Sequence, residues 1–174
     1  MDDAAHRALV EVLQRLQLLL LEPVDFTKTD SETTLAKVRL LSAAATYFNV
    51  LAISEFGGRL GPVRQEGLVE HVVGAAFQTY RGEELHSSPH EKAAMLFRGV
   101  TQGHPFTDAN KRTGFLLASY YLARMGYELR SDLPGREIVS FCRKVSAGEI
   151  RDIVTIAAAL QNWTEPRSGD AMQP

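Results

Sequence analysis

Apolar residues recur along this chain at steps of three and four, which is the spacing of one face of an α-helix. The pattern is clear over residues 4–21, where Pro23 stops it. It predicts further helices over residues 33–54, 66–79, 89–103, 110–125, 133–145 and 149–162. Residues 59–65 favour irregular or extended structure, and this segment is too short for a sheet. We therefore expect an all-α, single-domain helical bundle of six to seven helices.

Two of the predicted helices begin with a capping box, in which a Ser side chain and a Glu three residues later each satisfy a free backbone amide. Ser88 and Glu91 predict the start of the helix over residues 89–103, and Ser146 and Glu149 predict the start of the last helix. The helix over residues 110–125 is apolar nearly all round, which is typical of a helix at the centre of a bundle.

The composition limits the kinds of protein that this chain can be. Its 174 residues, 45% hydrophobic and 23% charged, are typical of one compact domain. The formal net charge of −2 excludes the broad basic surface of a non-specific nucleic-acid binder. The single cysteine, Cys142, forms no zinc-site pattern, and we expect it in the core. No uninterrupted apolar block, the four leucines of residues 18–21 included, approaches the about 20 residues of a membrane span, so we expect a cytoplasmic protein that binds neither membrane nor nucleic acid directly.

Residues 104–114, with the sequence HPFTDANKRTG, hold the most informative cluster of polar side chains. They place an imidazole, a carboxylate, an amide and two cations at the start of the most apolar helix. A helix N-terminus presents free amides and a positive dipole end, so it binds anions such as phosphate. Lys111 and Arg112 are unfavourable there for the helix alone, because cations stabilise the opposite end. Such a local conflict is expected at functional sites.

These residues suit the transfer of a phosphoryl or nucleotidyl group. Lys111, Arg112 and the turn amides could hold a phosphate chain, and Asp108 could bind Mg²⁺ together with it. His104 could accept the proton of an attacking hydroxyl at neutral pH. The site is not a Walker A loop, because GxxxxGK(S/T) does not occur in the chain. The residues alone leave open a second interpretation, in which His104 is a solvated or capping histidine and Asp108 a helix cap.

The same eleven residues resemble the signature of the Fic/Doc family, HPFx(D/E)GNGRxxR, and in particular that of its Doc (death-on-curing) branch, HxFxDANKRT. Residues 61–68, 122–127 and 147–150 also resemble segments of that family, so the similarity covers about residues 50–162. The resemblance implies a Fic/Doc fold with three parts. These are N-terminal helices over residues 1–54 (an extension plus the first core helix), a catalytic core over residues 55–163, and a flexible tail over residues 164–174.

The resemblance also implies a role for individual residues. His104 would be the catalytic base, Asp108 the Mg²⁺ ligand and Phe106 the structural anchor of the loop. The phosphates would be held at four consecutive positions, which are Ala109, Asn110, Lys111 and Arg112. A flap that docks the target protein would include Gly61, Val63 and Arg64.

Two residues depart from the common Fic pattern, and the first of them is typical of the Doc branch. Lys111 replaces a Gly of the nucleotidyl-transferring members, and Phe115 replaces the second Arg. The resemblance then implies a toxin that uses ATP and Mg²⁺ to phosphorylate a protein hydroxyl, a threonine of elongation factor Tu, and so blocks translation. The inhibitory pattern (S/T)xxxE(G/N) is absent, which favours restraint by a separate antitoxin protein. The alternatives are adenylyl transfer (AMPylation) to a target hydroxyl, and a catalytically silent module that binds a nucleotide or a partner.

Overall fold

The computed structural model describes residue 14 and residues 23–167. Four short strands form two antiparallel pairs, β1 with β2 and β3 with β4. The α-helices are α2 (Ser31–Phe56), α3 (Leu68–Gly74), α4 (Pro89–Gly103), α5 (Asn110–Arg124), α6 (Gly135–Ser146) and α7 (Ile153–Trp163). The strands are β1 (Thr79–Tyr80), β2 (Glu83–Glu84), β3 (Tyr127–Leu129) and β4 (Thr164–Pro166).

The described part of the chain confirms the all-α fold, with six α-helices and only short strands. The predicted helix over residues 4–21 lies outside the described residues, apart from residue 14. Residues 164–166, placed in the tail by the sequence, pair with β3, and residues 168–174 lie outside the description. None of the described helices combines the length and the apolar character that a membrane crossing requires.

Local side-chain caps explain where α4 and α7 begin. The capping box at α4 is confirmed, because Ser88 Oγ accepts from the Glu91 amide (3.1 Å) and the Glu91 carboxylate accepts from the Ser88 amide (3.1 Å). The predicted start of the last helix is wrong: α7 begins at Ile153, capped by Asp152. Ser146 cannot cap that helix because it is the last residue of α6.

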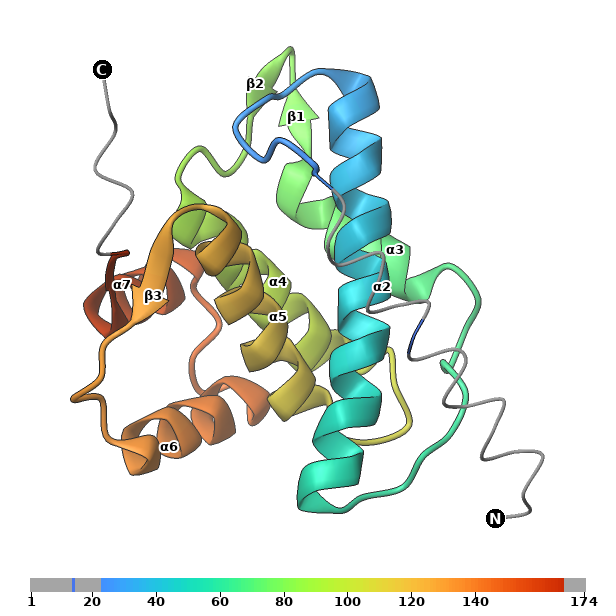
Figure 1. The fold of residues 1–174 in the computed structure, drawn as a ribbon, viewed down its shortest axis with the longest axis vertical. Coiled ribbons are helices and arrows are strands. Elements are labelled where there is room, and N and C mark those ends of the chain that lie inside the picture. Colours follow the sequence, from blue (N-terminus) through green and yellow to red (C-terminus); the bar gives the residue numbers. More distant parts are fainter. Residues whose placement is uncertain (1–13, 15–22, 168–174) are drawn as a thin grey trace.

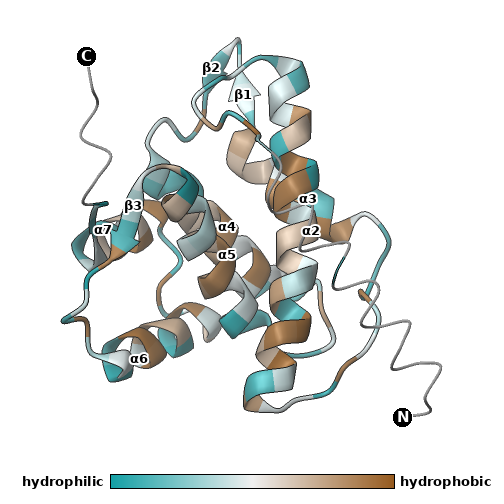
Figure 2. Ribbon diagram, viewed as in Figure 1, coloured by the Kyte–Doolittle hydropathy of each residue, from teal (hydrophilic) through white to brown (hydrophobic). Residues whose placement is uncertain are grey.

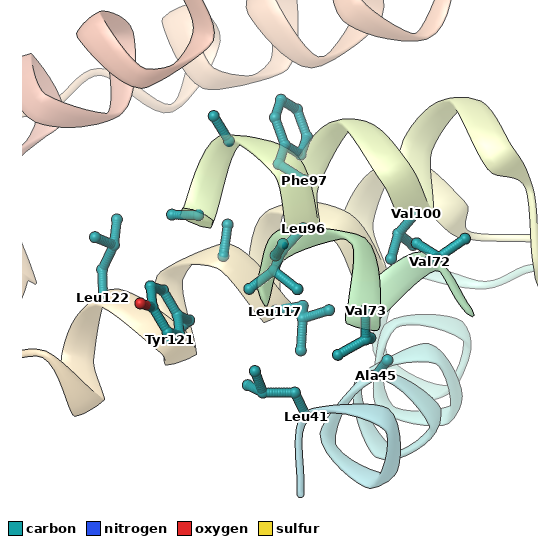
Figure 3. Packing of buried hydrophobic residues seen from close by; sticks show 14 of the residues in the cluster. Leu41, Ala45, Val72, Val73, Leu96, Phe97, Val100, Leu117, Tyr121 and Leu122 are labelled. Atoms are coloured by element: carbon teal, nitrogen blue, oxygen red, sulfur yellow. The ribbon is translucent and has the colours of Figure 1, made fainter. Parts of the chain in front are cut away.

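Helices α4 and α5 pack against each other at the centre, with α2 packed on α5 and α7 on α4 (Figure 1). Apolar residues lie along α3, α4, α5 and the middle of α2, whereas the β1–β2 hairpin is mainly hydrophilic (Figure 2). Leu41 of α2, Val73 of α3, Leu96 of α4 and Leu117 of α5 meet in one buried cluster (Figure 3).

The central pair of helices crosses closely at Gly114 of α5. A Cβ atom at this position would lie 2.7 Å from Thr101 Oγ1 and 2.9 Å from the Phe97 carbonyl oxygen, both on α4. Only glycine allows the two backbones to approach this closely. The crossing fixes the start of α5, and with it the residues of the sequence motif, against the end of α4.

Candidate active site

The loop over residues 104–109 joins α4 to α5 beside the C-terminal end of α2 (Figure 1). Both ends of this loop have left-handed backbone conformations, at His104 (φ 47°) and at Ala109 (φ 60°). Residues other than glycine rarely adopt this conformation, and it persists only where the surrounding structure holds it. The loop therefore depends on contacts that compensate for its strain.

The side chain of Asn110 closes the loop from within. Its Oδ1 accepts a hydrogen bond from the Phe106 amide (3.0 Å), and its Nδ2 donates to the Phe106 carbonyl (2.9 Å). Phe106 itself lies in the core, with 2% of its surface exposed. This pair of bonds holds the loop backbone against the first turn of α5.

The first turn of α5 presents backbone amides that the helix does not use. The first backbone hydrogen bond of the helix is donated by the Thr113 amide to the Ala109 carbonyl (2.9 Å). The amides of residues 110–112 precede it and have no acceptor within the helix. Together with the positive end of the helix dipole they form a site suited to an anion.

The carboxylate of Asp108 is oriented by two backbone amides. Oδ2 accepts from the amide of Arg59 (2.9 Å), and Oδ1 accepts from the amide of Ala109 (2.6 Å). These hydrogen bonds, with a smaller contribution from Arg112 and Lys111, hold the pKa of Asp108 below its ordinary value. Asp108 is therefore ionised at neutral pH.

Asp108 can take part in binding Mg²⁺, although no cluster of three or more His, Cys, Asp or Glu side chains occurs in the described part of the chain. A carboxylate has about four acceptor positions, and the two amides occupy only two of them. Mg²⁺ usually takes one or two carboxylates and completes its shell with water and substrate phosphates. The single carboxylate beside an anion site fits that arrangement.

His104 is half-buried at the end of α4, where it begins the loop. Within residues 14 and 23–167, no hydrogen bond occupies its imidazole ring. A ring nitrogen is thus available to accept a proton from a substrate hydroxyl.

Lys111 and Arg112 are both exposed, but they have different surroundings. Lys111 lies on a groove of about 500 Å³ that the end of α2 forms with α5 and α6. Arg112 also borders this groove, yet its Nη1 donates to the carbonyls of Ala52 (2.8 Å) and Gly57 (3.0 Å). The groove is lined by Phe56, Lys111, Arg112, Phe115, Leu116, Ile138, Val139, Cys142 and Arg143.

Cys142, expected in the core, is buried between this groove and the core. Burial raises the pKa of its thiol to about 11. The thiol is therefore protonated at neutral pH and is not a nucleophile of this site.

The predicted flap lies directly along the motif loop. Val63 and Phe106 form an antiparallel bridge, and the amide of Arg64 donates to the Pro105 carbonyl (2.9 Å). Gly61 packs tightly on Thr107, because a Cβ at Gly61 would lie 2.7 Å from Thr107 Oγ1. The structure thus brings Gly61, Val63 and Arg64 together with the loop that follows His104.

The sequence did not point to Asn49, which the structure places at the site. This residue of α2 has 4% of its surface exposed, and its Nδ2 donates to the Asp108 carbonyl (2.8 Å) and to Thr113 Oγ1 (3.0 Å). Asn49 lies on the same helix face as Leu41, Ala45 and Ala52, all buried. A polar residue within such an apolar stripe needs a hydrogen-bond partner. The position of Asn49 in the stripe was therefore the sequence signal that could have identified it.

Known proteins resemble the chain in the region of this site. Residues 42–122 match the sequence profile of the Fic/DOC family. The chain is also 30% identical over 108 residues to Toxin Doc from Mycolicibacterium smegmatis, a match that covers 62% of this chain and 82% of that protein. The chain belongs to the Fic/DOC family. The similarity to Toxin Doc confirms the Doc branch. Fic/DOC proteins are transferases that use a nucleotide substrate. The matched residues include the loop, α5 as far as residue 122 and the part of α2 that holds Asn49.

Proposed function

We propose that this Fic/DOC protein is a Doc-like toxin that transfers the γ-phosphoryl group of ATP to a protein hydroxyl, a threonine of elongation factor Tu. The observation that carries the proposal is the arrangement around one loop: the unoccupied imidazole of His104, the oriented carboxylate of Asp108 and the free amides at the start of α5. The similarity to a protein named Toxin Doc supports the biological role.

In the proposed reaction, the imidazole of His104 removes the proton of the target hydroxyl. The hydroxyl oxygen attacks the γ-phosphorus, and the bond from that phosphorus to the β–γ bridging oxygen breaks, so that ADP leaves. The amides of residues 110–112 and the ammonium of Lys111 hold the phosphate oxygens. Asp108 would hold Mg²⁺, which when bound would supply positive charge to offset the charge on the phosphates.

Docking of the target would involve Gly61, Val63 and Arg64. Val63 and Arg64 are exposed and the backbone is extended at Val63, where it bridges to Phe106, so this segment can pair with a target backbone. We further propose that the toxin acts in the cytoplasm, where translation takes place, and that a separate antitoxin restrains it.

The deciding experiment incubates the protein with elongation factor Tu and ATP labelled at either the γ or the α phosphate. Transfer of the γ label alone supports the kinase, and transfer of the α label alone would replace it with adenylyl transfer. Absence of transfer to elongation factor Tu and to every protein of a cell lysate would overturn the proposal in favour of a nucleotide-binding or partner-binding module.

Two substitutions test the assigned roles. His104→Asn should lower the transfer rate by about 10²–10⁴-fold, because the proton acceptor is lost, while ATP binding persists. Asn suits this position better than Ala, since it tolerates the left-handed backbone of residue 104. Lys111→Gly should abolish phosphoryl transfer and permit adenylyl transfer if Lys111 sets the orientation of ATP. An unchanged product would show that other residues set it.

A further inference from the structure

The side chain of Arg112 forms hydrogen bonds with the end of α2, more than fifty residues earlier in the chain. Its Nη1 donates to the carbonyl of Ala52 (2.8 Å), in the last turn of α2, and to that of Gly57 (3.0 Å), just beyond the helix. The guanidinium also lies 5.7 Å from the centre of the Phe56 ring. A cation at the C-terminal end of a helix interacts favourably with the helix dipole. Arg112 is therefore directed toward α2 and stabilises the end of that helix.

The turn that follows the end of α2 orients the carboxylate of Asp108. Gly57 (φ 72°) and Gly58 (φ 146°) carry the chain back toward the motif loop, and the amide of Arg59 then donates to Asp108 Oδ2 (2.9 Å). The approach is close, because a Cβ atom at Gly58 would lie 3.0 Å from the same oxygen. A small shift of this turn therefore changes the position or the hydrogen bonding of the carboxylate.

We infer that Arg112 is a positioning residue, which holds the turn over residues 57–59 so that the Arg59 amide orients the carboxylate of Asp108, the residue that would hold Mg²⁺. Lys111, one residue earlier, is the cation that contacts phosphate. The inference rests on the proposed function for the nature of the ligands, and it separates two adjacent cations that the sequence motif presents as equivalent.

The two roles need different properties of a basic side chain. Two carbonyl oxygens are held by one guanidinium nitrogen in a fixed plane, which a lysine ammonium on a flexible stem does not reproduce. Arg112→Lys therefore keeps the positive charge while it weakens the attachment to α2. Gly58→Ala disturbs the turn from the other side and alters no charge.

The first measurement is the hydrogen-exchange rate of the Arg59 amide in the ligand-free protein, followed by NMR. We expect exchange to become roughly tenfold faster in Arg112→Lys and in Gly58→Ala, since a hydrogen bond to a charged group is weakened. Lys111→Gln, the matched control, should leave this rate unchanged. Core amides of α4 and α5 should exchange as in the wild type in all variants, which shows that the fold is intact.

The second measurement is the affinity for a non-hydrolysable ATP analogue, with EDTA and with Mg²⁺. In EDTA, Arg112→Lys and Gly58→Ala should bind the analogue within about twofold of the wild-type affinity. With Mg²⁺, both variants should bind it roughly tenfold more weakly than the wild type, because they lose most of the affinity that Mg²⁺ adds. Lys111→Gln should lose affinity under both conditions.

Equal losses for Arg112→Lys and Lys111→Gln in EDTA, with normal Arg59 exchange, would overturn the positioning role and give Arg112 a direct phosphate contact. If the wild-type protein binds no nucleotide, the proposed function fails. The exchange rate of the Arg59 amide then still decides whether Arg112 holds the turn.

Discussion

Asn49 provides the sharpest test of how α2 supports the active-site loop. Its Nδ2 satisfies two acceptors, the Asp108 carbonyl at 2.8 Å and the fully buried Thr113 Oγ1 at 3.0 Å. Each lost hydrogen bond costs about 1 kcal/mol net, and more where a buried acceptor stays unsatisfied. Asn49→Ala should therefore lower the free energy of unfolding by about 2–3 kcal/mol. For a domain of this size the melting temperature should fall by about 4–12 °C.

The variant Asn49→Asp separates the hydrogen bonds from the loss of volume. Aspartate has the same shape, but it replaces a donor with a charged acceptor that faces the Asp108 carbonyl and is itself buried. Its destabilisation should exceed that of Asn49→Ala, because burial of an unpaired charge adds to the lost bonds. Thr46→Val serves as the control, since Thr46 Oγ1 donates only to the Ser42 carbonyl of its own helix. This change should stay within about 0.5 kcal/mol of the wild type.

Urea unfolding, followed by circular dichroism at pH 7, gives the free energies for this comparison. An Asn49→Ala protein within about 0.5 kcal/mol of the wild type would refute the reasoning. So would an Asn49→Asp protein more stable than Asn49→Ala, because the amide would then not be acting as a donor to these two acceptors.

Two further predictions concern the core and the pH dependence of stability. Gly114→Ala should lower the free energy of unfolding in urea by about 1–3 kcal/mol, because its Cβ would lie 2.7 Å from Thr101 Oγ1. Gly135→Ala, whose Cβ would have no atom within 4 Å, should leave this free energy nearly unchanged. Equal effects of the two substitutions would contradict the close crossing. His90 is buried, with its Nε2 at 2.9 Å from Thr164 Oγ1, and burial lowers the pKa of its imidazole. The unfolded chain therefore binds more protons than the folded protein as the pH falls through about 6.5. Stability should therefore decrease between pH 7.5 and 5.5, and the decrease should be smaller in His90→Gln, as measured by urea midpoints.

Sequence periodicity and caps predicted most of the fold, since they report local preferences that the packed helices keep. The start of α4 follows from the Ser88 capping box. The same pattern at Ser146 failed, because α6 continues through Ser146 and Gly148 then turns the chain in a left-handed conformation (φ 73°). A short pattern cannot tell whether the preceding helix has already ended.

The candidate site was predictable only where its residues are consecutive. Residues 104–114 stand together in the sequence, so their combined chemistry was visible. The contributions of Asn49 and Arg59 come from about fifty residues earlier, and Arg59 acts through its backbone amide. A backbone donor has no sequence signal. The predicted boundary between residues 54 and 55 runs through this contact, with Asn49 on one side and Asp108 on the other.

The dependence of the loop on α2 has a consequence for protein engineering. A segment of eleven residues that carries base, carboxylate and cations looks portable, as if it could be grafted between two helices of any stable bundle. The backbone at Asp108 and the orientation of its carboxylate, however, are held by the side chain of Asn49 and the amide of Arg59. A graft of residues 104–114 alone transfers the reactive groups without their geometry. The smallest transferable unit also includes residues 49–64 and the part of α4 that Gly114 packs against, at Phe97 and Thr101.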